Sequence, residues 1–409
     1  MHILLVHQAF ASFGEPGGTR HYEFARWLAA HGHHVTVIAS PVSYITGEIT
    51  QAGSTREAGS EAGAGVTILR ARVYSAHHKS FAHRLLAFFS FMWSSFWIGL
   101  RIKEVDLVWG TSPPIFQGVT AWILARLKRA AFLFEVRDLW PQFAVAAGVL
   151  RNRSLIVASE WLERTLARQA DCVVVNSPGF VEHMQSLGAR RVELVVNGAD
   201  PAMFDPASDG GDLRRNLGWT DKFTVLYAGA HGLSNDLEVV LQAARLLAGT
   251  HTQIVLVGDG KDKPALQESA AVLGLSNITF MASVPKSQMP QFLAAADACL
   301  AILKPLDVYK TTYPNKVFDY LAAGRPVILA IDGVIRDVVE AAACGIFVKP
   351  GDPAPLADAI RALAADPSRA RRMGARGRAY LEQHFSRDAI AQGFLEILES
   401  MMAKRPPHD

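Results

Sequence analysis

Short apolar runs alternate with helical periodicity along the whole chain. Ile3–Val6 is an apolar run of strand length, a loop rich in Gly and Pro follows it, and residues 22–29 place apolar side chains at helical spacing. A second apolar run, Val35–Ala39, follows Gly32, a residue typical of helix ends. Because parallel strands need a crossover between them, this opening predicts a nucleotide-type α/β unit.

The same alternation continues in two halves separated by a break in composition at residues 197–212, which are rich in Gly, Pro, Asp and Asn. Residues 54–65 are small and polar without periodicity, so we expect a surface loop there. Predicted strands before the break are Val66–Arg70, Leu107–Trp109, Phe132–Val136 and Cys172–Asn176. Predicted strands after it are Phe223–Tyr227, Gln253–Val257, Ile278–Met281, Ala298–Ile302, Val327–Ala330 and Gly345–Val348, with helices such as Leu237–Leu247 and Met289–Ala296 between them.

Length and composition agree with two α/β domains. The 409 residues are 50% hydrophobic, which is too much for one typical core and enough for two nucleotide-binding-sized domains. We therefore expect doubly wound domains at 1–200 and 201–386, followed by a final helix and tail at 387–409. Lys and Arg number 41 against 38 Asp and Glu, so the balance predicts no nucleic-acid partner, and any anion site must be local.

The cysteines and the N-terminus indicate a cytoplasmic protein. The three cysteines lie far apart in apolar stretches, without the paired spacing of a zinc or redox motif. The first residues lack the basic region and cleavage site of a signal peptide. These features predict reduced thiols and a cytoplasmic location.

An uncharged segment, Leu85–Leu100, carries six aromatic residues between Arg84 and Arg101. Its 16 residues fall short of the roughly 20 that a spanning helix needs. Two interpretations stay open: in-plane contact with a membrane surface, and a helix buried against the first sheet.

The loop after the first strand is the first candidate site. Gly17, Gly18, Thr19 and Arg20 precede a helix, so backbone amides there can receive a phosphate or a developing anion, and Arg20 can add a cation. A plain strand-to-helix turn explains the glycines equally well.

A second candidate lies at the end of the strand Phe132–Val136. Arg137 can bind an oxyanion, and Asp138 can accept a hydrogen bond from a sugar hydroxyl. Open α/β sheets place ligands at this edge. The alternative is an internal ion pair between the two side chains that fixes the loop.

Two glycine turns end adjacent strands of the second half. Gly229, His231 and Gly232 end the first strand, and Gly258 ends the next. Glycine allows close approach of phosphate to the backbone, and His231 can donate to that phosphate or cap the following helix.

The strongest local feature is the segment 309–327. Lys310 and Lys316 lie at the start of a helix, whose N-terminus is itself positive, and this favours a diphosphate. Asp319 follows Lys316 by three residues on the same helix face, where its carboxylate can hold ribose hydroxyls. Surface lysines with a solvated Asp are the alternative.

Taken together, these motifs resemble the group-1 retaining glycosyltransferases of family 4, which have the GT-B fold, and in particular the WbuB-like subgroup associated with O-antigen and capsule assembly. The motifs follow one another in family order over nearly the whole chain: GGTRHYE, FEVRDLWP, VVNSPGF, VVNGAD, YAGAHGL and PNKVFDYLAAGRPV.

The resemblance implies two Rossmann-like domains that face a cleft, with the final helix crossing back to the first domain. The nucleotide sugar is expected in the second domain and the acceptor in the first, near Thr19 and Arg20. The resemblance also implies that the enzyme needs no metal and no cofactor beyond the donor. Gly18, Arg137 and Asp138 are then expected to act in catalysis. Gly17 and the lysines are expected to contact the diphosphate. Val284 and Pro285 match backbone positions that read uracil, which favours UDP.

Three departures from the family pattern affect these expectations. Thr311 and Asp319 replace a pair of glutamates, and Arg137 replaces a histidine at the first-domain strand end. The usual Arg and Lys of the second domain are missing, and Lys310, Lys316 and His231 are the expected substitutes.

These inferences predict a hexosyltransferase or N-acetylaminosugar transferase that uses a polyprenyl-diphosphate-linked acceptor and touches the inner membrane peripherally. Two rival interpretations stay open: a UDP-N-acetylglucosamine 2-epimerase and a non-catalytic subunit that binds nucleotide sugars. An NAD-dependent dehydrogenase is disfavoured because no G-x-G-x-x-G follows the first strand.

Overall fold

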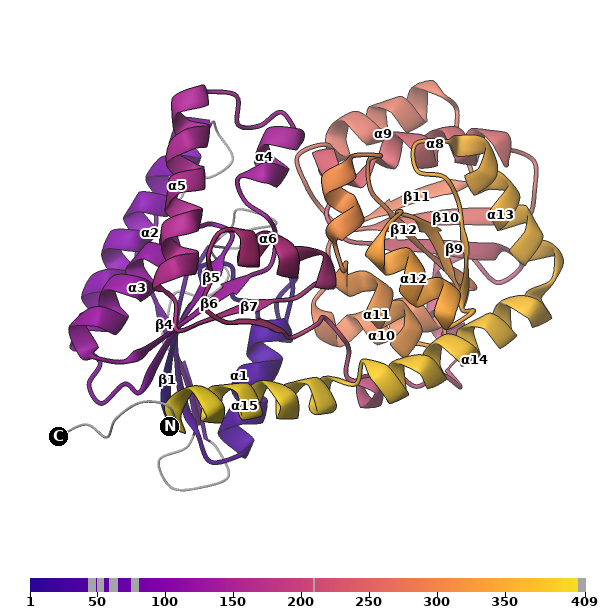
Figure 1. Ribbon diagram of the computed structural model, residues 1–409. Helices are drawn as coiled ribbons and strands as arrows, with labels where there is room; N and C mark the ends of the chain where they lie inside the picture. Colours follow the sequence, from indigo (N-terminus) through magenta and orange to yellow (C-terminus); the bar gives the residue numbers. More distant parts are fainter. Residues whose placement is uncertain (43–48, 50–54, 59–64, 75–80, 209, 404–409) are drawn as a thin grey trace. The chain divides into compact units, whose positions relative to one another are not determined.

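The computed structural model describes residues 1–409 except 43–48, 50–54, 59–64, 75–80, 209 and 404–409. The chain forms two compact units (Figure 1). Unit 1 comprises Met1–Val196 with Asp388–Asp409, and unit 2 comprises Asn197–Arg387. Each unit is a parallel sheet with helices on both faces, which confirms the predicted Rossmann-like α/β fold class.

The sheet of unit 1 has eight described strands, and all of its strand pairs are parallel except the one at the first edge. In spatial order the strands are β3 (Thr55–Ala58), β4 (Gly65–Arg70), β2 (His34–Ala39), β1 (His2–Val6), β5 (Leu107–Ser112), β6 (Ala131–Val136), β7 (Cys172–Val175) and β8 (Val192–Leu194).

One sequence expectation is corrected at that edge. The segment 54–65 was expected to be a loop, yet Thr55–Ala58 forms the strand β3, antiparallel to β4. An edge strand pairs on one side only and needs no apolar alternation, so periodicity does not reveal it. Residues 54 and 59–64 of this expectation lie outside the described residues.

Two helical layers cover the sheet of unit 1. One core, which contains Phe24, Trp109 and Phe394, lies between the sheet and the helices α1 (Arg20–Ala30) and α15 (Arg387–Ala403). The other core, which contains Phe91 and Phe132, lies under α2 (Phe81–Arg101), α3 (Phe116–Lys128), α5 (Arg153–Gln169) and α6 (Val181–Ser186). A short helix, α4 (Gln142–Ala146), follows β6.

The final helix α15 belongs to unit 1 although it follows unit 2 in sequence, as the family pattern implied. The ring of Phe394 stacks on Phe24 with 5.2 Å between centroids and lies 4.9 Å from Trp109. These contacts complete the core of unit 1 with residues from the end of the chain.

Unit 2 has a six-stranded parallel sheet. In spatial order its strands are β11 (Ile278–Met281), β10 (Thr252–Val257), β9 (Phe223–Ala228), β12 (Ala298–Ile302), β13 (Val327–Ala330) and β14 (Gly345–Phe347). Its helices are α7 (Gly211–Leu217), α8 (Leu237–Leu246), α9 (Lys263–Val272), α10 (Met289–Ala294), α11 (Asn315–Ala322), α12 (Val334–Ala341), α13 (Pro353–Ala365) and α14 (Pro367–His384). Buried clusters on both sheet faces place the carboxyl ends of β9 and β10 beside α11.

Candidate functional site

In unit 2, the carboxyl ends of β9 and β10 approach so closely that only glycine fits. Gly229 and Gly258 have φ angles of +150° and +152°. A Cβ atom on Gly258 would lie 1.8 Å from the carbonyl oxygen of Gly229. A Cβ on Gly229 would lie 2.6 Å from Nζ of Lys316, so the two predicted glycine turns and the predicted lysine meet at one place.

Lys316 is a shielded cation in the first turn of α11. Its ammonium lies 3.9 Å from the ring centroid of Tyr227 and has no hydrogen-bond partner among the described residues. Burial lowers its pKa to about 7. A buried ammonium without a carboxylate is energetically unfavourable, and the positive N-terminus of α11 adds to the local potential. The place is therefore suited to an anion.

His231 lies next to these glycines, and its imidazole has unused hydrogen-bonding capacity. The side chain is fully buried, and neither ring nitrogen has a partner in the described structure. Burial lowers its pKa to about 4, so the imidazole is neutral at physiological pH and can donate one N–H. A Cβ on Gly258 would lie 3.3 Å from Nε2 of His231. The neighbouring Gly232 has open space around its Cα and begins the turn Leu233–Asn235.

Lys310 differs from Lys316 in its surroundings. It lies in the 3-10 turn Asp307–Thr311, is exposed, and forms an ion pair with Asp307 at 2.8 Å. This pairing balances its charge locally. Lys316 is therefore the stronger candidate of the two for neutralising a diphosphate.

Asp319 is held by a lysine that sequence reasoning missed. Nζ of Lys286 lies 2.5 Å from Oδ2 of Asp319, and both side chains are largely buried. Lys286 directly follows Val284 and Pro285, the two residues expected to read the base. The only sequence signal was this adjacency, because 33 residues separate the paired side chains.

The segment that is expected to read the base is itself anchored to the end of β10. The carboxylate of Asp259 accepts a hydrogen bond from the backbone N–H of Ser283 at 2.7 Å. Lys263 donates to Asp259 and to the carbonyl oxygens of Gly258 and Met281 at 2.8 to 2.9 Å. Neither Asp259 nor Lys263 was expected to contribute, and together they fix the carboxyl ends of β10 and β11.

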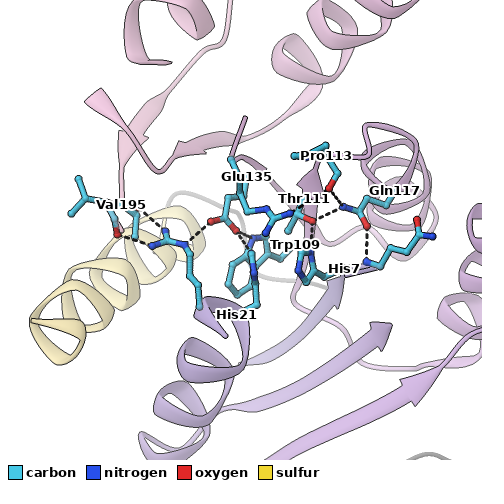
Figure 2. Close-up of polar contacts among 12 residues, drawn as sticks. His7, His21, Trp109, Thr111, Pro113, Gln117, Glu135 and Val195 are labelled. Atoms are coloured by element: carbon cyan, nitrogen blue, oxygen red, sulfur yellow. Dashed lines mark hydrogen bonds and ion pairs between the residues drawn. The ribbon is translucent and has the colours of Figure 1, made fainter. Parts of the chain in front are cut away.

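In unit 1, the buried carboxylate of Glu135 on β6 accepts several hydrogen bonds from neighbouring side chains (Figure 2). It accepts hydrogen bonds from Arg20 at 3.1 Å, His21 at 2.7 Å and the indole N–H of Trp109 at 2.9 Å. Burial alone would raise its pKa, but His21 and Arg20 hold the pKa of Glu135 below its usual value. Glu135 therefore stays ionised, while burial lowers the pKa of His21 to about 4 and keeps that ring neutral.

Arg20, which the sequence predicts to add a fixed cation to the loop, is buried and donates its hydrogen bonds to protein groups. Besides Glu135, its guanidinium donates to the carbonyl oxygens of Val195 and Val196 at 2.6 Å, and the residue is 4% exposed. Its physical role is to neutralise Glu135 and to tie the start of α1 to residues 195–196. The contact of Arg20 with an acceptor stays a prediction.

In the glycine loop before α1, the backbone is the part that is accessible to a ligand. Gly17 has a φ of +147°, whereas Gly18 is exposed with nothing near an added Cβ. The hydroxyl of Thr19 is buried and donates to Glu23 at 2.5 Å. The backbone of Gly18 can thus meet an anion, while the Thr19 side chain serves the helix start.

A second polar chain in Figure 2 starts at His7, which sequence reasoning missed. Nδ1 of His7 lies 2.7 Å from Oγ1 of Thr111, which also accepts from the Gln117 amide at 2.7 Å. Nε2 of His7 is buried without a partner among the described residues. The position of His7 directly after the apolar run of β1 was the available signal.

Arg137 and Asp138 lie at the end of β6 without forming the ion pair considered as an alternative. Arg137 donates weakly to the Pro113 carbonyl at 3.4 Å, and its Nε has no partner in the described structure. Burial raises the pKa of Asp138 to about 6, although the charge of Arg137 opposes this shift. At the end of β7, Oδ1 of Asn176 is likewise buried without a described partner. The carboxyl edge of this sheet is therefore polar and only partly satisfied, as a ligand-binding edge should be.

Two family models match the chain, one on each unit. Residues 17–199 match the glycosyl transferase 4-like domain, and residues 222–366 match the glycosyl transferases group 1. The two models together cover both Rossmann-like units described above, so the chain belongs to the group 1 glycosyltransferases and is a glycosyltransferase.

One sequence relative agrees with this assignment, and two solved structures share the fold. The chain is 26% identical over 320 residues to the putative colanic acid biosynthesis glycosyl transferase WcaI of Escherichia coli K12, covering 76% of this chain and 78% of WcaI. Sucrose-phosphate synthase from Thermosynechococcus elongatus has a similar structure, with a TM-score of 0.79, 19% identity and coverage of 99% and 100% of the two chains. Anabaena HepE, solved in complex with UDP and glucose, gives a TM-score of 0.72 at 18% identity and covers 98% and 100%.

Proposed function

We propose that this protein transfers a hexose or N-acetylaminosugar from a UDP-sugar to a polyprenyl-diphosphate-linked saccharide in bacterial surface polysaccharide assembly. The proposed transfer needs no metal and retains the anomeric configuration. The observation that carries the proposal is the shielded ammonium of Lys316 beside Gly229, at the N-terminus of α11.

A UDP diphosphate fits this place by charge. Lys316 and the first amides of α11 supply positive potential, and His231 can donate a neutral N–H. When the bond between the sugar C1 and the phosphate oxygen breaks, negative charge grows on the leaving UDP, and these groups stabilise it. The complex of HepE with UDP and glucose supports the choice of nucleotide.

The acceptor is assigned to the polar edge of unit 1. Arg137 can pair with an anionic group of the acceptor, and Asp138 can orient a sugar hydroxyl. In a front-face displacement, the acceptor oxygen bonds to C1 on the side that the phosphate leaves, and its proton passes to the leaving phosphate. The similarity to WcaI, a putative colanic acid biosynthesis glycosyl transferase, supports a polysaccharide acceptor.

Calorimetric titration with UDP, GDP, TDP and NAD, in the presence of a chelator, tests the donor assignment. We expect UDP to bind most tightly, and Lys316→Met to weaken it by about 10- to 100-fold, whereas Lys316→Arg keeps part of the affinity. Because the ammonium has a pKa of about 7 before a diphosphate arrives, UDP affinity should fall as pH rises above that value. Lys316→Met should abolish this slope.

A stability measurement on the same variant separates lost binding from misfolding. The pKa of Lys316 falls from 10.5 in the unfolded chain to about 7 in the folded protein, so wild-type stability rises with pH between these values. Lys316→Met should therefore melt at a higher temperature than wild type, by most below pH of about 7. A variant that both melts earlier and loses UDP binding would mean that Lys316 is structural.

Screening UDP-sugars with lipid-linked acceptors then decides between the enzyme classes. Sugar transferred to the acceptor supports the proposal. Release of free sugar without an acceptor indicates an epimerase-type reaction, and UDP binding without any turnover indicates an assembly subunit. Failure to bind any of the nucleotides would refute the catalytic proposal.

A further inference from the structure

The outer face of α2 is as apolar as its inner face. The inner side packs into the core of unit 1, where a Cβ on Gly99 would collide with Leu124. The outer side carries a stripe at helical spacing, in which Trp93 is 66% exposed and Trp97 43% exposed. Leu86 and Phe89 extend the stripe toward the start of the helix. Burial against the sheet therefore explains the inner side of this helix and leaves its exposed side, with Phe89, Trp93 and Trp97, unexplained.

The apolar surface continues onto the two neighbouring helices. Figure 1 shows α2, α3 and α5 side by side on one face of unit 1, and α3 contacts both of the others. Leu127 of α3 is 58% exposed and Trp161 of α5 is 66% exposed. Soluble monomers rarely expose several large aromatic residues on one face. We call this surface the α2–α5 face, defined by Leu86, Phe89, Trp93, Trp97, Leu127 and Trp161.

The charges on the same three helices are almost all positive. Their described, exposed charged side chains are one glutamate, Glu160, and five arginines: Arg101, Arg126, Arg153, Arg164 and Arg168. The whole chain has a net charge of only +3, so this excess is local. Exposed aromatics among arginines are the composition by which proteins bind anionic lipid surfaces in the membrane plane.

We propose that the α2–α5 face lies on an anionic phospholipid bilayer, with its aromatic side chains in the interface and its arginines at the headgroups. None of the described helices is long and apolar enough to cross a membrane, and the proposed contact needs none to do so. The proposal of a lipid contact is argued only from the composition of this surface. The purpose of that contact rests on the proposed function. One helix layer, about 10 Å thick, would separate the lipid from the sheet whose strand β6 leads to Asp138.

Co-sedimentation of the full-length protein with vesicles tests this contact. We expect binding to phosphatidylcholine vesicles that contain phosphatidylglycerol, weaker binding to phosphatidylcholine alone, and loss of binding as salt increases. The triple variant Trp93→Ser/Trp97→Ser/Trp161→Ser should bind at least about tenfold more weakly, and so should Arg101→Glu/Arg164→Glu. UDP titration of each variant verifies that unit 2 is intact and keeps this test separate from that of the proposed function.

Matched variants in unit 2 serve as controls. Val272 is 82% exposed on α9, and Arg245 is exposed on α8, so Val272→Ser and Arg245→Glu should bind vesicles as wild type does. The proposal is overturned if wild-type protein does not bind anionic vesicles. It is also overturned if the triple variant binds them as strongly as wild type. Self-association of wild type that the triple variant abolishes, without any effect of lipid, would assign the face to a second copy of this chain instead.

Discussion

At the scale of single residues, burial rather than ion pairing sets the pKa values of Lys316 and Asp138. Lys316 and Asp138 have opposite signs, and neither forms an ion pair with a described side chain. Removal from water disfavours the charged form of each, which lowers the lysine pKa to about 7 and raises the aspartate pKa to about 6. Groups whose pKa values are shifted toward neutral pH in this way are typical of sites that bind or transfer charge.

Asp138→Asn should stabilise the protein in a pH-dependent way. The pKa of this carboxyl rises from 3.8 to about 6 on folding, so the folded state binds more protons between these values and wild-type stability falls as pH rises through them. The Asn side chain has no such loss. Its advantage in urea unfolding should therefore grow from pH of about 4 to about 6 and then stay level, at up to about 3 kcal/mol.

The exposed Asp221 provides the control for this experiment, since Asp221→Asn removes a carboxylate that remains in water. A stabilisation by Asp138→Asn that does not vary with pH would show that the Asp138 carboxyl is ionised throughout. In that case its environment would favour an ion-pairing role over a hydroxyl-orienting one.

At the scale of elements, the first turn of α1 is fixed by a charge on β6. Arg20 and His21 are the first two residues of the helix, and both donate to Glu135. The Gly17–Gly18 loop directly precedes this turn, so Glu135 positions the backbone that is proposed to meet an anion. Glu135 is a positioning residue in this scheme, because it is fully buried.

Glu135→Gln should reduce the free energy of unfolding by about 3–5 kcal/mol, because it leaves the buried guanidinium of Arg20 without a counter-charge. The loss should be smaller when the same substitution is made in an Arg20→Met background. Urea unfolding of the four proteins in this double-mutant cycle measures the difference. Equal losses in both backgrounds would show no coupling, and the exposed Glu182→Gln should be close to neutral.

Sequence patterns predicted the central elements of both units better than the edges and the charge pairs. Central strands such as Phe132–Val136 are buried on both sides and leave a continuous apolar run. The edge strand β8, Val192–Leu194, pairs only with β7 and contains a charged residue, so it leaves no such signal. The glycine turns were predictable from their place after strands, whereas the pairing of Asp319 with Lys286 depends on folding that joins distant segments.

At the scale of the whole molecule, unit 1 is built from both ends of the chain. Unit 2 is inserted between β8 and α15, so unit 1 is complete only when α15 returns to its sheet. Phe394 is 1% exposed and lies against Phe24 and Trp109 in that core. Seven of the eight tryptophans lie in unit 1, so tryptophan fluorescence reports mainly on this unit, while UDP binding reports on the proposed site of unit 2.

Phe394→Ala should lower the stability of unit 1 by about 3–5 kcal/mol, because it leaves a cavity between α15 and the sheet. The fluorescence transition in urea should shift to lower denaturant, while the affinity for UDP in native buffer stays within about twofold of wild type. Phe318→Ala removes a fully buried ring from the core of unit 2, and it should disturb UDP binding with little change in the fluorescence midpoint. If Phe394→Ala weakened UDP binding as well as shifting the fluorescence transition, the two units would fold as one cooperative block. The return of α15 would then stabilise unit 2 as well as unit 1.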